Sequence, residues 1–208
     1  MKTKIIPISD PNAVSTALEF LRAGELIAFP TDTVYGVGTF AFNGKAAQHI
    51  YTVKKRSPDK AIPILLGDIS QIPLVAVNLP ESALKLAEAF WPGALTLAVP
   101  KHPDIPEEVS SLETVGIRIP DHDFTRALLN AAGPMAVTSA NISGKDSPVD
   151  AGDVYAQLKG ILPLILDGGH TRGGTSSTVI DCTRDEIVIL REGPIQREEI
   201  ERVLAVKD

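Results

Sequence analysis

Short apolar runs alternate with helical stripes along this chain, and this alternation constrains the fold more than any other feature. A short apolar run between turn signals is typical of a buried strand, whereas apolar residues at every third or fourth position indicate a helix. Strands that alternate with helices favour an α/β domain built on one mixed sheet. The expected strands are residues 4–8, 26–29, 62–66, 95–99, 115–119, 135–138, 164–166, 178–181 and 187–190. The expected helices are residues 11–23 (capped by Asp10), 44–53 (capped by Asn43), 69–77, 81–90, 124–132, 151–158 and 196–204.

Length and composition indicate one globular domain over residues 1–208. With 208 residues and 44% hydrophobic residues, the chain can bury a sizeable core. Its net charge of −6 argues against general nucleic-acid binding but leaves a local basic patch open. A single cysteine excludes an internal disulfide and fits a reducing compartment. No apolar run approaches the roughly 18 to 20 residues of a membrane span, so we expect a cytoplasmic protein without membrane partners. The histidines and the cysteine lack metal-ligand spacing, so no metal site is expected.

The segment from Phe29 to Gly38 carries more polar chemistry than a connection between two elements requires. Two threonines, an aspartate, a tyrosine and two glycines follow the apolar run 26–29 directly. Hydroxyls supply short hydrogen bonds, and glycines allow the backbone to approach a ligand closely. We therefore expect this segment to form one wall of a binding site, at the strand ends where α/β folds place their ligands.

Two basic features allow either a structural or a functional interpretation. Lys54, Arg56 and Lys60 follow a helix, where they can be solvated charges that complement its C-terminus or a polyphosphate site with Lys54 and Arg56 on one side. Arg118 lies between Ile117 and Ile119 in an expected strand, so its guanidinium requires either a protein carboxylate or a bound anion. Gly116, two residues earlier on the same face, would leave room for a ligand.

Hydroxyl and amide groups also follow two later strands. Residues 138–144 contain four such side chains, which exceeds what a helix cap needs, and the glycine-rich segment 168–178 ends in further hydroxyls. Neither the Walker nor the dinucleotide pattern is present. No nucleophile triad or paired-glutamate arrangement stands out either. Hydroxyls, amides and guanidinium groups suit positioning and charge stabilisation of phosphate and carboxylate chemistry. The residues alone thus indicate a binder of an anionic small molecule, plausibly a nucleotide enzyme.

Seven segments in one order give the chain a resemblance to a known family. They are Pro30-Thr31-Asp32-Thr33-Val34-Tyr35-Gly36, Lys54-x-Arg56, Trp91-Pro92-Gly93-Ala94-Leu95-Thr96, Val115-Gly116-Ile117-Arg118-Ile119-Pro120, Thr138-Ser139-Ala140-Asn141-x-Ser143-Gly144, Ser177-Thr178-Val179-Ile180-Asp181 and Leu190-Arg191-x-Gly193. Together they cover about residues 20–195, and the chain resembles the YrdC-like threonylcarbamoyl-AMP synthases in their short form, without an additional C-terminal domain. The chain departs from the family pattern at Ala94 and at Ser57, where prolines are usual.

The resemblance implies a nucleotidyltransferase that joins L-threonine, bicarbonate and ATP into L-threonylcarbamoyladenylate and releases pyrophosphate. Magnesium would travel with the ATP phosphates. Downstream proteins would transfer the threonylcarbamoyl group to tRNA, and weak RNA binding is a further expectation. The implied fold is a twisted mixed sheet surrounded by helices, with a deep, positively charged cavity. Two alternatives remain: an RNA-binding module, which the acidic balance and few aromatic residues disfavour, and a carbamoyl-adenylate domain like that of hydrogenase-maturation carbamoyltransferases.

Site residues follow from the resemblance position by position. It implies that threonine contacts Thr33, Arg118, Ser139 and Ser177. It implies that ATP contacts Arg56, Lys60, Thr114, Asn141, Val149 (through its backbone) and Arg191. Lys54 and Arg56 are the expected catalytic residues, with Lys54 in a basic wall.

Overall fold

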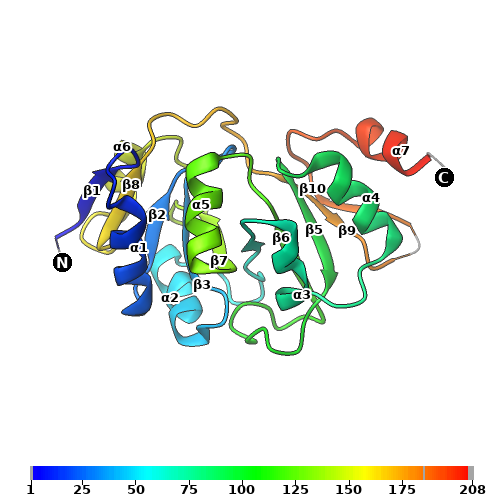
Figure 1. Ribbon diagram of the computed structural model, residues 1–208, viewed down its shortest axis with the longest axis horizontal. Helices are drawn as coiled ribbons and strands as arrows, with labels where there is room; N and C mark the ends of the chain where they lie inside the picture. The colour runs from blue at the N-terminus through cyan, green and yellow to red at the C-terminus, as the bar shows by residue number, and fades with distance from the viewer. Residues whose placement is uncertain (1, 185, 206–208) are drawn as a thin grey trace.

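One mixed sheet organises the part of the chain that the computed structural model describes, residues 2–184 and 186–205 (Figure 1). Its strands are β1 (Lys4–Pro7), β2 (Ile27–Phe29), β3 (Gly36–Phe40), β4 (Ile64–Leu65), β5 (Leu95–Pro100), β6 (Thr114–Arg118), β7 (Met135–Ser139), β8 (Leu164–Asp167), β9 (Thr178–Asp181) and β10 (Val188–Arg191). The helices are α1 (Ala13–Arg22), α2 (Gly44–Lys54), η1 (Ile69–Gln71), α3 (Ile72–Val75), α4 (Glu81–Phe90), α5 (Asp123–Ala132), α6 (Ala151–Leu158) and α7 (Arg197–Ala205). The predicted α/β class with a mixed sheet is confirmed.

Strands far apart in the sequence lie side by side in this sheet. The order is β1-β8-β2-β3-β7-β4-β6-β5-β9-β10, and the strands follow one another along the long axis of the molecule, from the N-terminal side toward the C-terminal helix α7 (Figure 1). Strand β2 is parallel to β8 but antiparallel to β3, and β5 is parallel to β9 but antiparallel to β6. The sheet therefore collects segments from the whole described sequence, which lets distant motifs meet.

Alternation along the strands separates two hydrophobic cores. The larger core contains Ala28 and Val37, together with apolar residues of α2, α4 and α6. The smaller core contains Ile27 and Phe29, together with residues of α1 and α5. Because successive side chains of a strand point to opposite faces, the two cores lie on opposite sides of the sheet. All three residues of β2 are buried, as expected for a strand covered on both faces.

The structure corrects three of the expected elements. Residues 36–40 form β3, which the sequence interpretation assigned in part to the binding loop. The first helix begins at Ala13 rather than after Asp10, because the Asp10 carboxylate accepts from the backbone N–H of Asn12 and stabilises a turn there. The expected helix 69–77 is a short 3₁₀ turn followed by the one-turn helix α3. No helix in the described ranges combines the length and apolar character that crossing a membrane requires.

Candidate functional site

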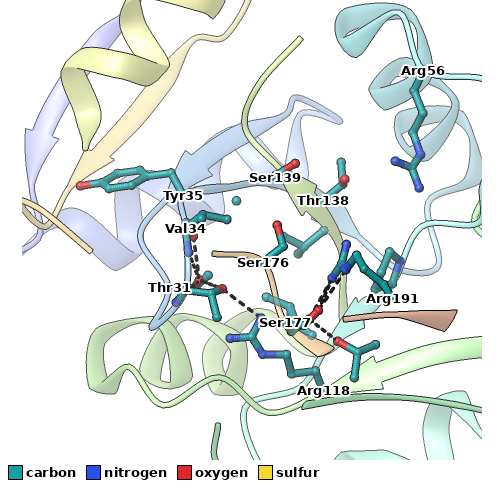
Figure 2. A pocket seen from close by; sticks show the side chains of 16 residues that line it. Thr31, Val34, Tyr35, Arg56, Arg118, Thr138, Ser139, Ser176, Ser177 and Arg191 are labelled. Carbon is teal, nitrogen blue, oxygen red and sulfur yellow. Dashed lines mark hydrogen bonds between the residues drawn. The ribbon is translucent and has the colours of Figure 1, made fainter. Parts of the chain in front are cut away.

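A cavity of about 130 Å³ lies against the central strands and collects most of the predicted site residues. Its walls combine hydroxyl groups and arginines with a few apolar side chains. They are Thr31, Thr33, Val34, Tyr35, Gly36, Arg56, Pro63, Leu65, Thr96, Arg118, Val137, Thr138, Ser139, Ser176, Ser177 and Arg191. Figure 2 shows Arg118 and Arg191 approaching Ser177 from different elements, while Thr138 and Ser139 line another side.

The cavity lies on a face of the sheet and not beyond one edge of it. Gly36 pairs with Ser139, whereas Leu65, on a strand antiparallel to β7, pairs with Arg118 toward the other end of the strands. The lining residues Gly36, Leu65, Thr96, Arg118 and Val137 alternate with Val37, Ile64, Leu97, Ile117 and Ala136 of the larger core. The expectation of a site at the strand ends holds residue by residue, since Leu65, Arg118 and Ser139 are the last residues of β4, β6 and β7. Antiparallel neighbours place those ends on opposite edges, so the cavity spans the face between them.

Arg118 is held from three directions. Its Nε donates to the carbonyl oxygen of Gly93 at 2.8 Å, its Nη1 to Thr33 Oγ1 at 3.1 Å, and its Nη2 to Asp32 Oδ1 at 2.5 Å. Burial lowers the pKa of Arg118, and the adjacent Asp32 carboxylate opposes that shift. The structure thus confirms a protein carboxylate partner for Arg118, and because the arginine also lines the cavity, its contact with a bound anion stays a prediction.

The hydroxyls beside Arg118 form a directional chain. Thr31 Oγ1 donates to the carbonyl oxygen of Val34 at 2.7 Å, and it lies 3.0 Å from Thr33 Oγ1. Because the Thr31 proton is used on Val34, Thr33 is the donor to Thr31, while it accepts from Arg118. One lone pair of Thr33 then remains for the cavity. Thr33 is therefore prepared to accept a hydrogen bond from a ligand.

The opposite wall is formed by Ser177, Arg191 and Thr96. Arg191 Nη2 donates to the carbonyl oxygen of Ser177 at 2.7 Å and to its hydroxyl at 3.1 Å. The Ser177 hydroxyl also lies 2.8 Å from the hydroxyl of Thr96. Burial lowers the pKa of Arg191, and the charges of Arg118 and Arg56 lower it further. Arg56, Arg118 and Arg191 thus line the same cavity and interact electrostatically across it.

A second, larger cavity of about 440 Å³ shares Arg56 and Ser139 with the first. The remaining lining residues are mainly basic or polar: Lys54, Lys55, Ser57, Lys60, Asn141, Ser143 and Gly144. Arg56 is braced by the chain that follows it, since its Nε donates to the carbonyl oxygen of Lys60 at 3.1 Å and its Nη2 to that of Ala61 at 2.8 Å. The two cavities thus form neighbouring compartments with a shared arginine.

Lys54 lines this larger cavity, but its side chain is almost fully buried. It is 2% exposed, and its ammonium donates to the carbonyl oxygens of Ser139 and Asn141, the latter at 2.5 Å. Burial lowers the pKa of Lys54 to about 7, and the Arg56 charge acts in the same direction. Helix α2 continues through Lys54, and Lys55 then adopts a left-handed conformation (φ 53°), so Lys54 and Arg56 do not share one extended side. Lys54 fixes the turn that carries Ser139 and Asn141.

Two predicted ATP contacts lie outside both cavities. Thr114 begins β6, where its carbonyl oxygen accepts from the Ser110 hydroxyl at 2.6 Å. The carbonyl oxygen of Val149 accepts from the backbone N–H of Thr171 at 2.8 Å. Their assignments stay predictions. Gly116 does not leave space for a ligand, because an added Cβ would lie 3.1 Å from the Thr96 methyl group.

Sequence reasoning missed Asp32 and Thr96 as individual site residues. Thr96 alternates with Leu95 and Leu97 of the larger core, so the period of two that selected Arg118 could also have selected Thr96. Asp32 was visible only as one member of a polar loop. The ion pair that gives it a role joins residues 86 positions apart, so it depends on tertiary structure.

Comparison with known proteins identifies the family of the chain. A family model named Sua5_yciO_yrdC and described as "Telomere recombination" matches residues 19–193. The chain belongs to this family. A Bacillus subtilis relative named threonylcarbamoyl-AMP synthase is 44% identical over 97% of this chain, which spans 59% of that relative. A Mycobacterium tuberculosis relative named putative threonylcarbamoyl-AMP synthase is 37% identical, with 98% of this chain and 96% of the relative covered.

Solved structures also resemble the chain. Pyrococcus abyssi Sua5 complexed with L-threonine superposes with a TM-score of 0.94 at 40% identity, covering 98% of this chain and 61% of that protein. Escherichia coli YciO gives a TM-score of 0.86 at 25% identity, covering 95% of this chain and 99% of that protein. The chain thus spans about three-fifths of some relatives and nearly all of others.

Proposed function

We propose that this chain synthesises L-threonylcarbamoyladenylate from L-threonine, bicarbonate and ATP, with release of pyrophosphate. The observation that carries the proposal is the buried Arg118 guanidinium, set among hydroxyls in a small cavity that adjoins a larger, lysine- and arginine-lined one. An amino acid carboxylate suits the first compartment, and a nucleotide triphosphate suits the second. The names of the relatives and the threonine complex of Pyrococcus abyssi Sua5 support the same assignment.

In this reaction the protein would act mainly by alignment. Arg118 would bind the threonine carboxylate, while Thr33, Ser139 and Ser177 would satisfy its other polar groups. The threonine amine combines with bicarbonate to give a carbamate and water, and a carbamate oxygen then attacks the α-phosphorus of ATP as pyrophosphate departs. Holding both reactants in adjoining compartments makes this attack effectively unimolecular.

Charge stabilisation would come from the larger cavity and its border. Arg56, Lys60 and Arg191 would offset the triphosphate charge and the charge that develops on the leaving pyrophosphate. Lys54 would support this step by holding the 139–141 turn. Within the described residues there is no group of three or more His, Cys, Asp or Glu side chains suited to a metal ion. Any magnesium would therefore enter with the phosphate oxygens of ATP.

The wider context belongs to the same proposal. The product would pass to proteins that transfer the threonylcarbamoyl group to tRNA, and the enzyme would be a cytoplasmic nucleotidyltransferase in which residues 1–208 act as one domain. Direct RNA binding and carbamoyl phosphate chemistry are the alternatives. Both predict that the purified chain releases no pyrophosphate in response to threonine when RNA is absent.

Pyrophosphate release from ATP tests the proposal directly. Release should require threonine and bicarbonate together, and it should proceed without RNA. Substituting Arg118→Lys keeps the charge but removes the fork that binds a carboxylate through two nitrogens. We expect the KM for threonine to rise by about tenfold or more, because a hydrogen bond to a charged group is worth roughly 1.5–3 kcal/mol. The KM for ATP should change far less.

The exposed Arg202→Lys on α7 serves as the matched control and should behave as wild type. Release that ignores threonine or follows carbamoyl phosphate instead would disprove the proposed function. Equal loss of threonine and ATP use in Arg118→Lys would disprove only the assignment of Arg118.

A further inference from the structure

Asp32 is the carboxylate that pairs with Arg118 among the described residues, and neither the motif comparison nor the relatives gives it a role. The ion pair is well shielded, with side-chain exposures of 13% for Asp32 and 6% for Arg118. A shielded charge pair has a definite geometry, because solvent does not compete for either group. Asp32 therefore affects the orientation of Arg118 and offsets its positive charge.

The position of Asp32 separates it from the ligand space. Asp32 does not line the 130 Å³ cavity but lines a neighbouring cavity, which shares Thr31 with the first, together with Pro30, Asp121, His122 and Arg172. Arg118 lines the first cavity and not the second. The carboxylate thus contacts the arginine without lining the cavity in which a ligand would bind.

The number of N–H donors that Arg118 has left for a ligand follows from its hydrogen bonds within the protein. A guanidinium has five N–H groups. Three N–H groups of Arg118 already donate within the protein, to the Gly93 carbonyl, the Thr33 hydroxyl and the Asp32 carboxylate. One N–H remains on each terminal nitrogen, which is the number that a bidentate carboxylate contact needs. The three anchors together restrict rotation of the guanidinium plane.

We propose that Asp32 is a positioning residue that holds the Arg118 guanidinium for the carboxylate of the amino acid substrate. This inference rests on the proposed function. It assigns Asp32 to the amino acid half of the reaction and not to the nucleotide half. Gly93 and Thr33 fix Arg118 through neutral acceptors, whereas Asp32 contributes the countercharge that keeps a buried guanidinium in place before substrate arrives.

Steady-state kinetics of pyrophosphate release and calorimetric titration with L-threonine test the proposal on purified protein. Asp32→Ala should raise the KM and Kd for threonine by about 10- to 100-fold, the equivalent of one charge-assisted hydrogen bond. Its kcat and its KM for ATP should change much less. Asp32→Asn keeps an oxygen acceptor for Arg118 and should recover part of the lost affinity. Asp121→Asn removes a charge from the same neighbouring cavity and should match wild type.

Three results would overturn the positioning role. Unchanged threonine affinity in Asp32→Ala would show that Arg118 needs no such anchor. Tighter threonine binding by Asp32→Asn would show that Asp32 weakens the site by competing for Arg118. A uniform drop in all parameters, with a matching loss of folded protein, would indicate a purely structural role. Absence of threonine binding by the wild-type protein would instead overturn the proposed function and this inference together.

Discussion

Replacing Gly193 with alanine should damage the candidate site through the backbone, without altering a side chain that lines it. A Cβ at Gly193 would lie 2.4 Å from the backbone nitrogen of Thr178 and 2.6 Å from both the carbonyl oxygen of Ser176 and the carbonyl carbon of Ser177. Ordinary contacts begin near 3.4 Å, so the two segments must separate by about 1 Å. Because all three neighbours are backbone atoms, no side-chain rotation can relieve the clash.

Two effects should follow from that displacement. Overpacking of this kind costs about 1–3 kcal/mol of stability, which urea unfolding would measure. Moving Ser177 by about 1 Å relative to Arg118 should lower kcat/KM for threonine-dependent pyrophosphate release by about 100-fold. Gly152→Ala in α6 is the matched control, since its added Cβ would meet only the end of the Asp150 side chain, at 3.2 Å. Wild-type stability and activity in Gly193→Ala would refute the argument.

Two further predictions concern residues that organise the cavity walls. Thr31→Val removes the hydroxyl to which Thr33 donates its proton, so the KM for threonine should rise about tenfold. Thr31→Ser keeps that hydroxyl and should have the wild-type KM. Equal KM values in the two variants would contradict the directional chain. Lys54 should make the stability of the protein depend on pH, because its pKa is lowered to about 7 in the folded protein from an ordinary value of 10.5 when unfolded. Between these values the unfolded chain holds a proton that the folded protein has lost, so the free energy of unfolding should rise with pH. Urea titrations at pH 6 and pH 9 should show a smaller rise in Lys54→Met than in wild type, and an identical rise would argue against the shifted pKa.

The sequence predicted individual elements better than it predicted the location of the site. Alternation around Arg118 correctly placed its side chain on the face opposite Ile117, because period-two patterning depends only on local geometry. Strand β3 was harder to predict, since two of the five residues in its sequence, Gly-Val-Gly-Thr-Phe, are glycines, which are depleted in strands. Its glycines are explained by tertiary packing: a Cβ at Gly38 would lie 2.6 Å from the carbonyl oxygen of Ala136.

The orientation of charged side chains was the least predictable property of the candidate site. The expectation of a basic wall treated Lys54 and Arg56 as neighbours on an extended turn, but the helix ends one residue later than expected and the chain reverses at Lys55. Lys54 then meets the carbonyl oxygen of Asn141, 87 positions away. Local propensity contains no information on such a contact, so a basic pair in a sequence does not by itself show which member faces a ligand.

The residues that form the cavity walls are far apart in the sequence, and this separation affects how the protein folds during its synthesis on the ribosome. Thr31 and Thr33 emerge early, yet Arg191 reaches the same space only after β10 has joined β9. A nascent chain that ends before β10 would have the first wall without the last one, and contacts between distant segments form slowly. Ligand binding would therefore require that β10 has been synthesised and has folded. A small molecule in the cell could stabilise only chains whose synthesis has continued past β10.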